Sequence, residues 1–530
     1  MEVAVLPVLL LLLALFFSSS YSATWGGGHP DDDDIHRWCS FTPHPRACAY
    51  YLSLPPRPPM PKDKLGFFRL SVHAALKRAV RARRRLMSLK RRCKNQRARP
   101  AWADCAKLYE NAVLQLNRTL RRPPTKSRGG DDAQTWLSAA LTDLDMCWKS
   151  FAELRAPLRL IKPLGKYNTS ELISNSLAVN KPLANATAAF TAAPGGFPSW
   201  TSNKVRRLLQ ASATSVKANL IVVKDGSGNF RTLKDAINAA SNMTRKGRFV
   251  IYVKAGVYNE NVQITSSMTD ITLVGDGKGK TIITGRNSVA AGFTLITSAT
   301  LSVFGDRFIA RDMTFRNTNG PGSQALALLV ASDQSVVYRC GIEGYQDTLF
   351  AFSQRQFYRE CDISGTIDFI FGNAAAVFQN CNIYLRKPRK GESNVITAQG
   401  RSDPNQNTGI VIQFSNISSS AELLPVRRTV RSYLGRPWMK YSRTVYLQNN
   451  IGSLIDPAGW LPWNGDFALS TLYYAEFRNK GPGSRMSRRV KWPGYHIIVK
   501  PSLVRKFTVG NFIAGGVWLP STGVPFASGL

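Results

Sequence analysis

The sequence predicts a helical N-terminal domain followed by a parallel β-helix, and three observations support this fold class. Apolar residues recur with helical period between about residues 36 and 185, for example in the segments 65–80 and 136–141. From about residue 219 onward, β-branched and aromatic residues dominate, interrupted by Gly, Asn and Asp. Within this second half, similar segments recur about every 20 residues, which is typical of a solenoid.

The repeat is clearest in the segments 336–342, 357–363 and 377–383, which place Cys340, Cys361 and Cys381 at equivalent positions. Each repeat is one coil that buries its apolar face by stacking on its neighbours. Equivalent positions on stacked coils lie about 4.8 Å apart, which suits the Cα spacing of a disulfide. We therefore expect a Cys340–Cys361 bridge with Cys381 free. The alternative is a stack of three buried thiols.

The same spacing places two carboxylates together. Asp347 follows Cys340 by seven residues, and Asp368 follows Cys361 by seven. Two carboxyl groups about 5 Å apart do not both ionise readily, so one pKa should rise while the other stays low. Such a pair supplies an acid and a nucleophile at one pH. A ladder of surface Asp residues in turns is the alternative, and the apolar neighbours of both residues argue against it.

Four cysteines of the helical half suggest two disulfides. Cys39 and Cys48 flank a proline-rich turn, and a Cys105–Cys147 bridge would tie two helices of a bundle. The segment 186–203 is rich in Ala, Thr, Pro, Gly and Ser, and the dibasic pair Arg206-Arg207 follows it. Exposed linkers of this kind are where proteolytic cleavage concentrates, so we expect processing there.

The net charge and the N-terminal residues indicate where the protein acts and which kinds of molecule it binds. The formal net charge of the 530 residues is +37, and such a surface attracts polyanions. The apolar run 6–17 followed by small residues is typical of a signal peptide, covering residues 1–23. Secretion makes nucleic acid an improbable partner and an acidic glycan the better one. Asn-x-Ser/Thr sequons are compatible with a glycoprotein. The basic run from Arg81 to Arg99 is either a solvated helix face or a polyanion-binding strip.

Two family resemblances cover almost the whole chain. The helical half resembles the pectin methylesterase inhibitor family in its paired early cysteines, its Asp104-Cys105-x-x-Leu-Tyr segment and its Asp-x-Cys ending at Cys147; the basic run and Cys93 fall outside that pattern. The second half resembles plant pectin methylesterases through five motifs in order. These are 256–260 (GVYNE), 324–328 (QALAL), 345–349 (YQDTL), 368–372 (DFIFG) and 434–438 (LGRPW).

These resemblances imply a right-handed parallel β-helix as the catalytic domain, preceded by an all-α four-helix bundle. The implied domains are a signal peptide at 1–23, an inhibitor-like helical pro-domain at 36–185, a linker with the dibasic site at 186–210, and the catalytic β-helix at 211–530. The implied setting is the cell wall, with no membrane attachment after signal cleavage. The pro-domain, and separate inhibitor proteins, are expected to contact the enzyme.

The resemblance also implies a reaction and the residues that perform it. The reaction is hydrolysis of galacturonate methyl esters in pectin (homogalacturonan), with no metal or other cofactor. Asp368 is the implied nucleophile, Asp347 the acid and then the base, and Gln324 and Gln346 the oxyanion donors. Arg436 is expected to pair with Asp368. Trp438 is expected to offer an aromatic face to a sugar ring, and Tyr345, Phe371 and Trp463 are expected either to line the groove or to belong to the core.

Two alternative functions are considered for the second half of the chain. A β-helical polygalacturonase or lyase acts on the same polymer but cuts the chain. A non-catalytic pectin-binding or inhibitor protein would lack one or more of Asp347, Asp368 and Arg436, and all three are present. A Ser-His-Asp hydrolase is disfavoured, because the second half has no Gly-x-Ser-x-Gly motif and His496 is its one histidine. We expect His496 to be structural and Gly226-Ser227-Gly228 to form a turn.

Overall fold

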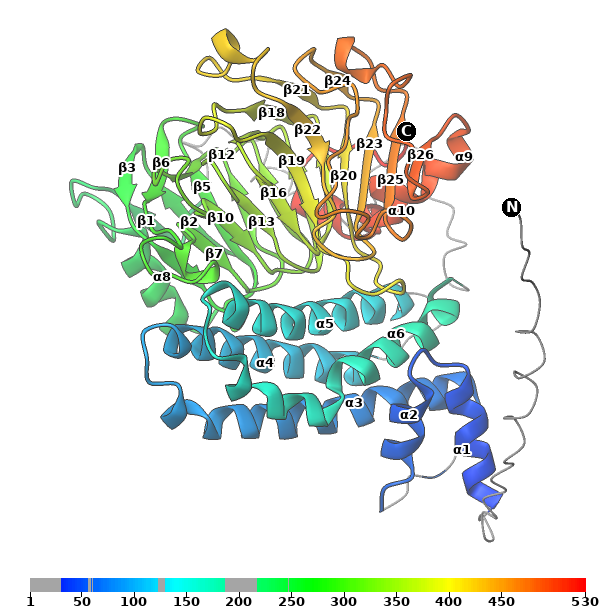
Figure 1. Cartoon of the computed structure of the whole chain (residues 1–530). Coiled ribbons are helices and arrows are strands. Elements are labelled where there is room, and N and C mark those ends of the chain that lie inside the picture. Colours follow the sequence, from blue (N-terminus) through cyan, green and yellow to red (C-terminus); the bar gives the residue numbers. More distant parts are fainter. Residues whose placement is uncertain (1–29, 56–58, 60, 123–128, 186–216, 246) are drawn as a thin grey trace, which may run out of the picture.

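A helical bundle and a stack of parallel strands form the two parts of the protein (Figure 1). The structure is a computed structural model that describes residues 30–55, 59, 61–122, 129–185, 217–245 and 247–530. The expected signal peptide, and the linker with its dibasic pair, lie outside these residues. No helix among the described residues is long and apolar enough to cross a membrane.

Four long helices pack side by side in the N-terminal part. Their bounds are α3 (Lys64–Ser88), α4 (Ala98–Arg121), α5 (Gly129–Glu153) and α6 (Thr169–Asn185). The side chain of Asp63 caps α3 by accepting a hydrogen bond from the Gly66 amide at 2.6 Å. The expected Cys105–Cys147 disulfide is present and joins α4 to α5.

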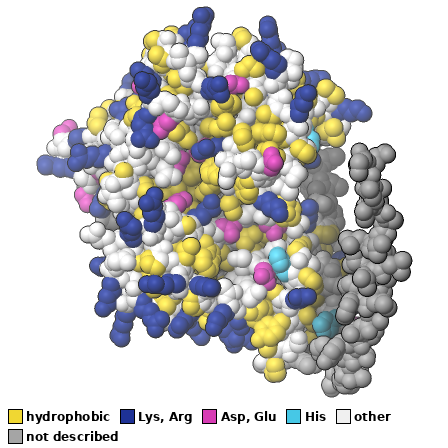
Figure 2. Space-filling view, viewed as in Figure 1, with side chains coloured by type: hydrophobic (Ala, Val, Ile, Leu, Met, Phe, Trp, Pro, Cys, Tyr) yellow, Lys and Arg dark blue, Asp and Glu magenta, His cyan; other side chains and the backbone are white. Residues whose placement is uncertain are grey.

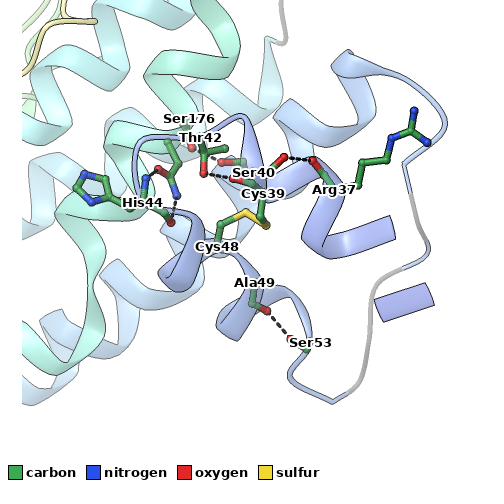
Figure 3. The surroundings of a disulfide bond; sticks show 11 residues. Arg37, Cys39, Ser40, Thr42, His44, Cys48, Ala49, Ser53 and Ser176 are labelled. Carbon is green, nitrogen blue, oxygen red and sulfur yellow. Dashed lines mark hydrogen bonds between the residues drawn. A yellow bond between two sulfur atoms is a disulfide. The ribbon is translucent and has the colours of Figure 1, made fainter. Parts of the chain in front are cut away.

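A helical hairpin precedes the bundle. It consists of α1 (Pro30–Ser40) and α2 (Pro45–Leu52), and the Cys39–Cys48 disulfide closes the turn between them (Figure 3). The backbone of His44 exchanges two hydrogen bonds with the side chain of Asn175 on α6, at 2.8 and 3.0 Å. Both disulfides predicted for the helical half are therefore confirmed.

Three parallel sheets form the walls of the C-terminal part. Within each coil, successive strands belong to different sheets. In the described residues the sheets have eleven, eight and seven strands. The eleven-stranded sheet contains β1 (Leu220–Val222), β2 (Phe249–Val253), β5 (Ile271–Gly275), β8 (Ile309–Arg311), β11 (Ser335–Tyr338), β14 (Arg355–Arg359), β17 (Ala375–Gln379), β20 (Gly409–Gln413), β23 (Arg443–Leu447), β25 (Tyr473–Phe477) and β26 (Tyr495–Ile497). The eight-stranded sheet contains β3 (Gly256–Asn259), β6 (Thr281–Gly285), β9 (Thr314–Asn317), β12 (Gly341–Glu343), β15 (Asp362–Gly365), β18 (Asn382–Leu385), β21 (Asn416–Ser419) and β24 (Asn450–Ile451). The seven-stranded sheet contains β4 (Val262–Ile264), β7 (Leu301–Val303), β10 (Leu328–Val330), β13 (Leu349–Ala351), β16 (Ile370–Gly372), β19 (Asn394–Gln399) and β22 (Ser432–Gly435).

The register between coils follows the repeat seen in the sequence. Gly341 pairs with Asp362, and Asp362 pairs with Asn382, so the residues that follow the three cysteines lie on successive rungs. Inward-facing apolar side chains of all three sheets form one continuous core. The parallel β-helix predicted from the repeat is therefore confirmed, and so is the helical domain before it.

Short helices cover one end and one face of the β-helix. Helix α8 (Leu233–Asn242) packs its apolar face into the core near β1 and β4. The C-terminal helices α9 (Pro501–Val504), α10 (Val509–Phe512) and α11 (Gly515–Trp518) lie on the outer face of the eleven-stranded sheet. His496 lies on β26, where its ring contacts Tyr473 at 4.5 Å between centroids.

Helix α5 lies between helices α3 and α4 of the bundle on one side and the β-helix on the other (Figure 1). Every residue from Ala133 to Leu144 is buried, as expected of a helix with packing partners on all sides. One hydrophobic cluster joins the bundle to the outer face of the seven-stranded sheet, where Leu329, Phe350 and Phe371 stand on adjacent rungs. The two parts thus share one packed interface.

The predicted Cys340–Cys361 disulfide is wrong, because both cysteines are free and buried. Stacked side chains leave neighbouring rungs in the same direction, so the sulfur atoms do not have to face each other. Each thiol instead donates to a backbone carbonyl: Cys340 to Tyr338 at 3.4 Å, and Cys361 to Val337 at 3.3 Å. Cys381 is also free, so the alternative of three buried thiols describes this structure.

Candidate active site

Asp347 and Asp368 occupy equivalent positions on adjacent rungs, two residues before strands β13 and β16. The pairing of Leu349 with Ile370 sets this register, and the Asp347 amide donates to the carbonyl of Ile367 at 3.0 Å. Both aspartates have positive φ, 61° and 52°, a conformation in which Asp is tolerated better than most residues. Each is 5% exposed. The repeat therefore brings the two carboxyl groups together at a buried turn.

Arg436 distinguishes the two carboxylates, because it forms hydrogen bonds only with Asp368 among the contacts of the described residues. Its Nε donates to Asp368 Oδ1 at 2.8 Å, and its Nη2 donates to Oδ2 at 2.6 Å. This is the paired geometry that a guanidinium forms with a carboxylate. Arg436 follows β22, three rungs from β13 in the seven-stranded sheet. The expected Asp368–Arg436 pair is present.

The surroundings raise the pKa of both aspartates, to different extents. Burial raises the pKa of Asp347 well above its usual value, and the negative charges of Asp368 and Glu153 raise it further. Burial also raises the pKa of Asp368, but the hydrogen bonds and charge of Arg436 oppose that rise. The expectation that the second pKa stays low is therefore wrong in this closed structure, because burial outweighs Arg436. Asp347 is still the stronger candidate for the protonated member.

The two glutamines lie beside this pair. A hydrogen bond from the side chain of Gln324 reaches Asp347 and partly offsets the rise of its pKa. Gln324 precedes β10, one rung before Asp347, since Ala325 donates to the carbonyl of Gln346 at 3.2 Å. Gln346 is half-buried and directly precedes Asp347. Two amide side chains thus lie next to the carboxyl pair.

Trp438 forms an aromatic wall beside the carboxyl pair. Its ring packs edge-on against Phe350 and Phe371, with centroids 6.1 and 5.7 Å away, and these two phenyl rings stack at 4.3 Å. A side chain at Gly400 would meet the Trp438 ring at 2.6 Å, so glycine there allows the indole to lie flat. Two other aromatic residues expected near the site have cationic partners: Tyr345 lies under Arg386 at 3.7 Å, and Trp463 lies under Arg436 at 4.4 Å.

A charged stripe of α5 faces this site from the bundle. Asp145, Lys149 and Glu153 are spaced four residues apart and therefore share one side of the helix. The Lys149 ammonium lies 4.0 Å above the Trp438 ring, and Glu153 is near enough to raise the pKa of Asp347. Asp145 accepts a hydrogen bond from Ser402 at 2.6 Å. The C-terminal half of α5 therefore covers the candidate active site.

Ion pairs fix the other half of α5 to the β-helix. Arg355 on β14 is 5% exposed and contacts both Asp333 and the α5 residue Asp132 at 2.7 Å. The indole of Trp136 donates to Asp333 at 3.1 Å. Arg118 of α4 pairs with Asp306 at 2.7 Å and lies over the Trp136 ring. Charged contacts thus hold the bundle at both ends of α5.

The buried carboxyls of the interface have raised pKa values. Burial raises the pKa of Asp145 to about 6 and that of Glu153 to about 7. Burial also lowers the pKa of Lys149. Because the neutral acids are the forms that burial favours, this interface should become less stable as the carboxyls ionise.

The charged stripe of α5 was not predicted from the sequence. Its only signal is the spacing of Asp145, Lys149 and Glu153, and that spacing is equally typical of a solvated helix face. Of the residues proposed from the sequence, the structure brings Asp347, Asp368, Gln324 and Arg436 into one cluster. It places Gln346 and Trp438 beside that cluster.

Comparison with known proteins agrees with both halves of the chain. Residues 219–516 match the family described as Pectinesterase, and residues 33–179 match the family described as Plant invertase/pectin methylesterase inhibitor. The chain is 51% identical over 498 residues to "Pectinesterase 2" of Citrus sinensis, covering 94% of this chain and 95% of that protein. It is also 51% identical to "Probable pectinesterase/pectinesterase inhibitor 17" of Arabidopsis thaliana, covering 94% of each.

A solved structure agrees with the second half. "Pectin methylesterase from Carrot" matches with a TM-score of 0.59 and 51% sequence identity, covering 60% of this chain and 99% of that one. The expected class, a carboxylic ester hydrolase, is the class of this family. The chain therefore belongs to the pectinesterase family and carries an inhibitor-family domain in front of its β-helix.

Proposed function

We propose that this chain hydrolyses the methyl esters of pectin to carboxylates and methanol, with Asp368 as nucleophile and Asp347 as acid and base. The observation that carries this proposal is the asymmetry of the carboxyl pair. Arg436 pairs with Asp368, while Asp347 has a strongly raised pKa. Arg436 opposes the rise in the pKa of Asp368, so Asp368 ionises more readily than Asp347, and the pair can supply the nucleophile and the acid that the two steps of ester hydrolysis require.

The first step forms an acyl-enzyme. An oxygen of Asp368 attacks the ester carbonyl carbon, and Asp347 gives its proton to the departing methoxy group, which leaves as methanol. The amides of Gln324 and Gln346 donate to the oxyanion. In the second step, Asp347 takes a proton from water while the water oxygen attacks the acyl carbon. The bond to Asp368 then breaks, and the galacturonate product leaves.

The site's aromatic wall supports a sugar polymer as the substrate. Trp438 has an aromatic face suited to a sugar ring, and Lys149 occupies that face in the intact chain. The basic β-helix also favours a polymer that carries carboxylates: residues 211–530 contain 37 Lys and Arg against 19 Asp and Glu. No cofactor has a role in the proposed reaction.

We further propose that the bundle is an internal inhibitor. Helix α5 covers Trp438 and places Glu153 near Asp347, so a polymer cannot reach the carboxyl pair while the bundle is docked. Cleavage at Arg206-Arg207 by a processing protease would free the β-helix. The proposed domains are a signal peptide (1–23), the inhibitor-like helical pro-domain (36–185), a linker with the dibasic processing site (186–210) and the catalytic β-helix (211–530).

The proposed setting is the plant cell wall. The apolar run 6–17 supports secretion through a cleaved signal peptide, and sequons support glycosylation. Separate inhibitor proteins are proposed partners, because the bundle of this chain belongs to an inhibitor family and docks on the same face.

The test compares the residue 210–530 fragment with its Asp368→Asn variant on methylated pectin, measuring methanol release and polymer length together. We expect the variant to lose activity by about a thousandfold or more, because a nucleophile is removed, while its circular dichroism is unchanged. Asp362→Asn is the matched control, since Asp362 lies on the neighbouring strand β15 and pairs with Lys278. Near-normal turnover by a folded Asp368→Asn variant contradicts the mechanism, and chain scission by the parent indicates a polygalacturonase or lyase.

A further inference from the structure

A second charged feature of the bundle lies far from the active site. Between Lys77 and Arg99 the sequence has twelve Lys and Arg and no Asp or Glu. The segment covers the end of α3, the short turn η1 (Lys90–Arg92) and the start of α4. Figure 2 shows Lys and Arg side chains gathered along the lower edge of the molecule, where Figure 1 places α3. We refer to the exposed cations of residues 77–99 as the basic strip.

The helical part of the strip is one continuous face. Lys77, Arg81, Arg84 and Arg85 are all exposed, and at 100° per residue they fall within about a third of the helix circumference. They span about 12 Å of helix axis. The opposite face of α3 is packed inside the bundle, with Val72, which is 0% exposed, among its buried residues.

The strip continues beyond α3. Six further cations follow within ten residues, and all are exposed. They are Lys90, Arg91, Arg92, Lys94, Arg97 and Arg99. Arg78 and Arg83 are only partly exposed and do not belong to the basic strip. Arg83 pairs with Glu110 at 3.5 Å, and Arg78 lies over Tyr51.

Crowded like charges on a surface are unfavourable unless an anion neutralises them. A helix that binds a membrane inserts an apolar face, but the apolar face of α3 is buried in the bundle. The strip therefore suits an extended, water-exposed polyanion. The polymer with regularly repeated carboxylates that this chain would itself produce is de-esterified galacturonan.

We propose that the basic strip binds de-esterified galacturonan, and that it does so while the active site is still covered. Helix α3 lies on the side of the bundle opposite the β-helix (Figure 1), so docking of α5 leaves the strip accessible. The unprocessed chain would then attach to regions of pectin that already carry free carboxylates. The choice of this polymer rests on the proposed function.

The test measures binding of the full-length chain to polygalacturonate, with Asp368→Asn in every protein so that the polymer stays unchanged. Uncut linkers are verified by intact mass. The strip variant removes five positive charges. Its substitutions are Arg81→Gln, Arg84→Gln, Arg85→Gln, Arg91→Gln and Arg92→Gln.

The matched control removes five exposed positive charges from the β-helix, so the net charges of the two variants are equal. Its substitutions are Arg428→Gln, Arg431→Gln, Arg485→Gln, Arg488→Gln and Lys491→Gln. We expect the strip variant to bind polygalacturonate at least about tenfold more weakly, with a smaller dependence on salt, because fewer counterions are exchanged. The control should stay within about twofold of the parent.

Three results overturn the proposal. Equal weakening in both variants means that net charge alone governs binding, and unchanged binding of the strip variant means that the polymer attaches elsewhere. Strip-dependent binding to vesicles with anionic phospholipid, without strip-dependent binding to polygalacturonate, assigns the strip to a membrane. Methanol release is measured separately with Asp368 retained, so the ester-hydrolase proposal and the strip proposal can fail independently.

Discussion

The charged contacts between the bundle and the β-helix give the sharpest test of internal inhibition. The test protein carries Asp132→Asn and Arg118→Gln, which remove the contacts to Arg355 and Asp306. Its linker also carries Arg206→Gln and Arg207→Gln, so that processing does not release the bundle. The cores of the bundle and of the β-helix are unchanged by these substitutions.

The expected magnitude follows from the two contacts. Hydrogen bonds to charged groups contribute about 1.5–3 kcal/mol each. The side chains of Asp132 and Arg118 are 27% and 24% exposed, so solvent places both at the lower end of that range. Their joint loss is about 3 kcal/mol. Because about 1.4 kcal/mol changes an equilibrium tenfold, the undocked population should rise roughly a hundredfold until docking is lost.

The assay is the initial rate of methanol release by the uncut full-length chain. We expect the double variant to be up to about a hundredfold faster than the linker-only parent. The control carries Arg83→Gln and Glu110→Gln, an exposed pair within the bundle, and should match the parent. An unchanged rate in the interface variant, or an uncut parent as fast as the free 210–530 fragment, refutes inhibition by docking.

Three further predictions concern processing, pH and salt. The secreted protein should begin close after Leu209, as N-terminal sequencing would show; a mature form that retains the bundle contradicts this. Since burial raises the pKa of Asp145 to about 6 and of Glu153 to about 7, docking is most stable below their ordinary values and weakens as pH rises through 6–7. The rate of the uncut chain relative to the 210–530 fragment should therefore rise between about pH 5 and 7.5, and less so in Glu153→Gln. Activity of the fragment should peak at intermediate ionic strength, with a KM that climbs beyond the peak between about 10 mM and about 1 M NaCl; a flat KM means that charge does not guide the substrate.

The parts of the structure that follow a period could be predicted from the sequence. The equal spacing of Asp347 and Asp368 after their cysteines fixes their place on adjacent rungs, because each coil of the β-helix has nearly the same length. Arg436 lies 68 residues beyond Asp368, and only the family motif pointed to it. The two disulfides of the helical half followed from local spacing and helix pairing.

Features that depend on side-chain direction or on docking could not be predicted. Rung spacing allows both a disulfide and two free thiols at Cys340 and Cys361, and the thiols find backbone acceptors instead. The face of α5 that meets the β-helix has charges at Lys149 and Glu153, which a pattern alone assigns to solvent. The raised pKa of Asp368 depends on burial in the assembled chain, which no local sequence feature gives.

The most direct test of the carboxyl-pair mechanism is the mass of Asp368 during the first turnover. The 210–530 fragment is mixed with a methyl-esterified oligogalacturonide, quenched in acid within the first turnover and digested at low pH, and the mass of the peptide containing Asp368 is measured. The mechanism predicts that this peptide gains the mass of the oligomer less methanol, and that the gain disappears when Asp368→Asn is added. First-turnover methanol release with an unmodified Asp368 peptide would contradict it.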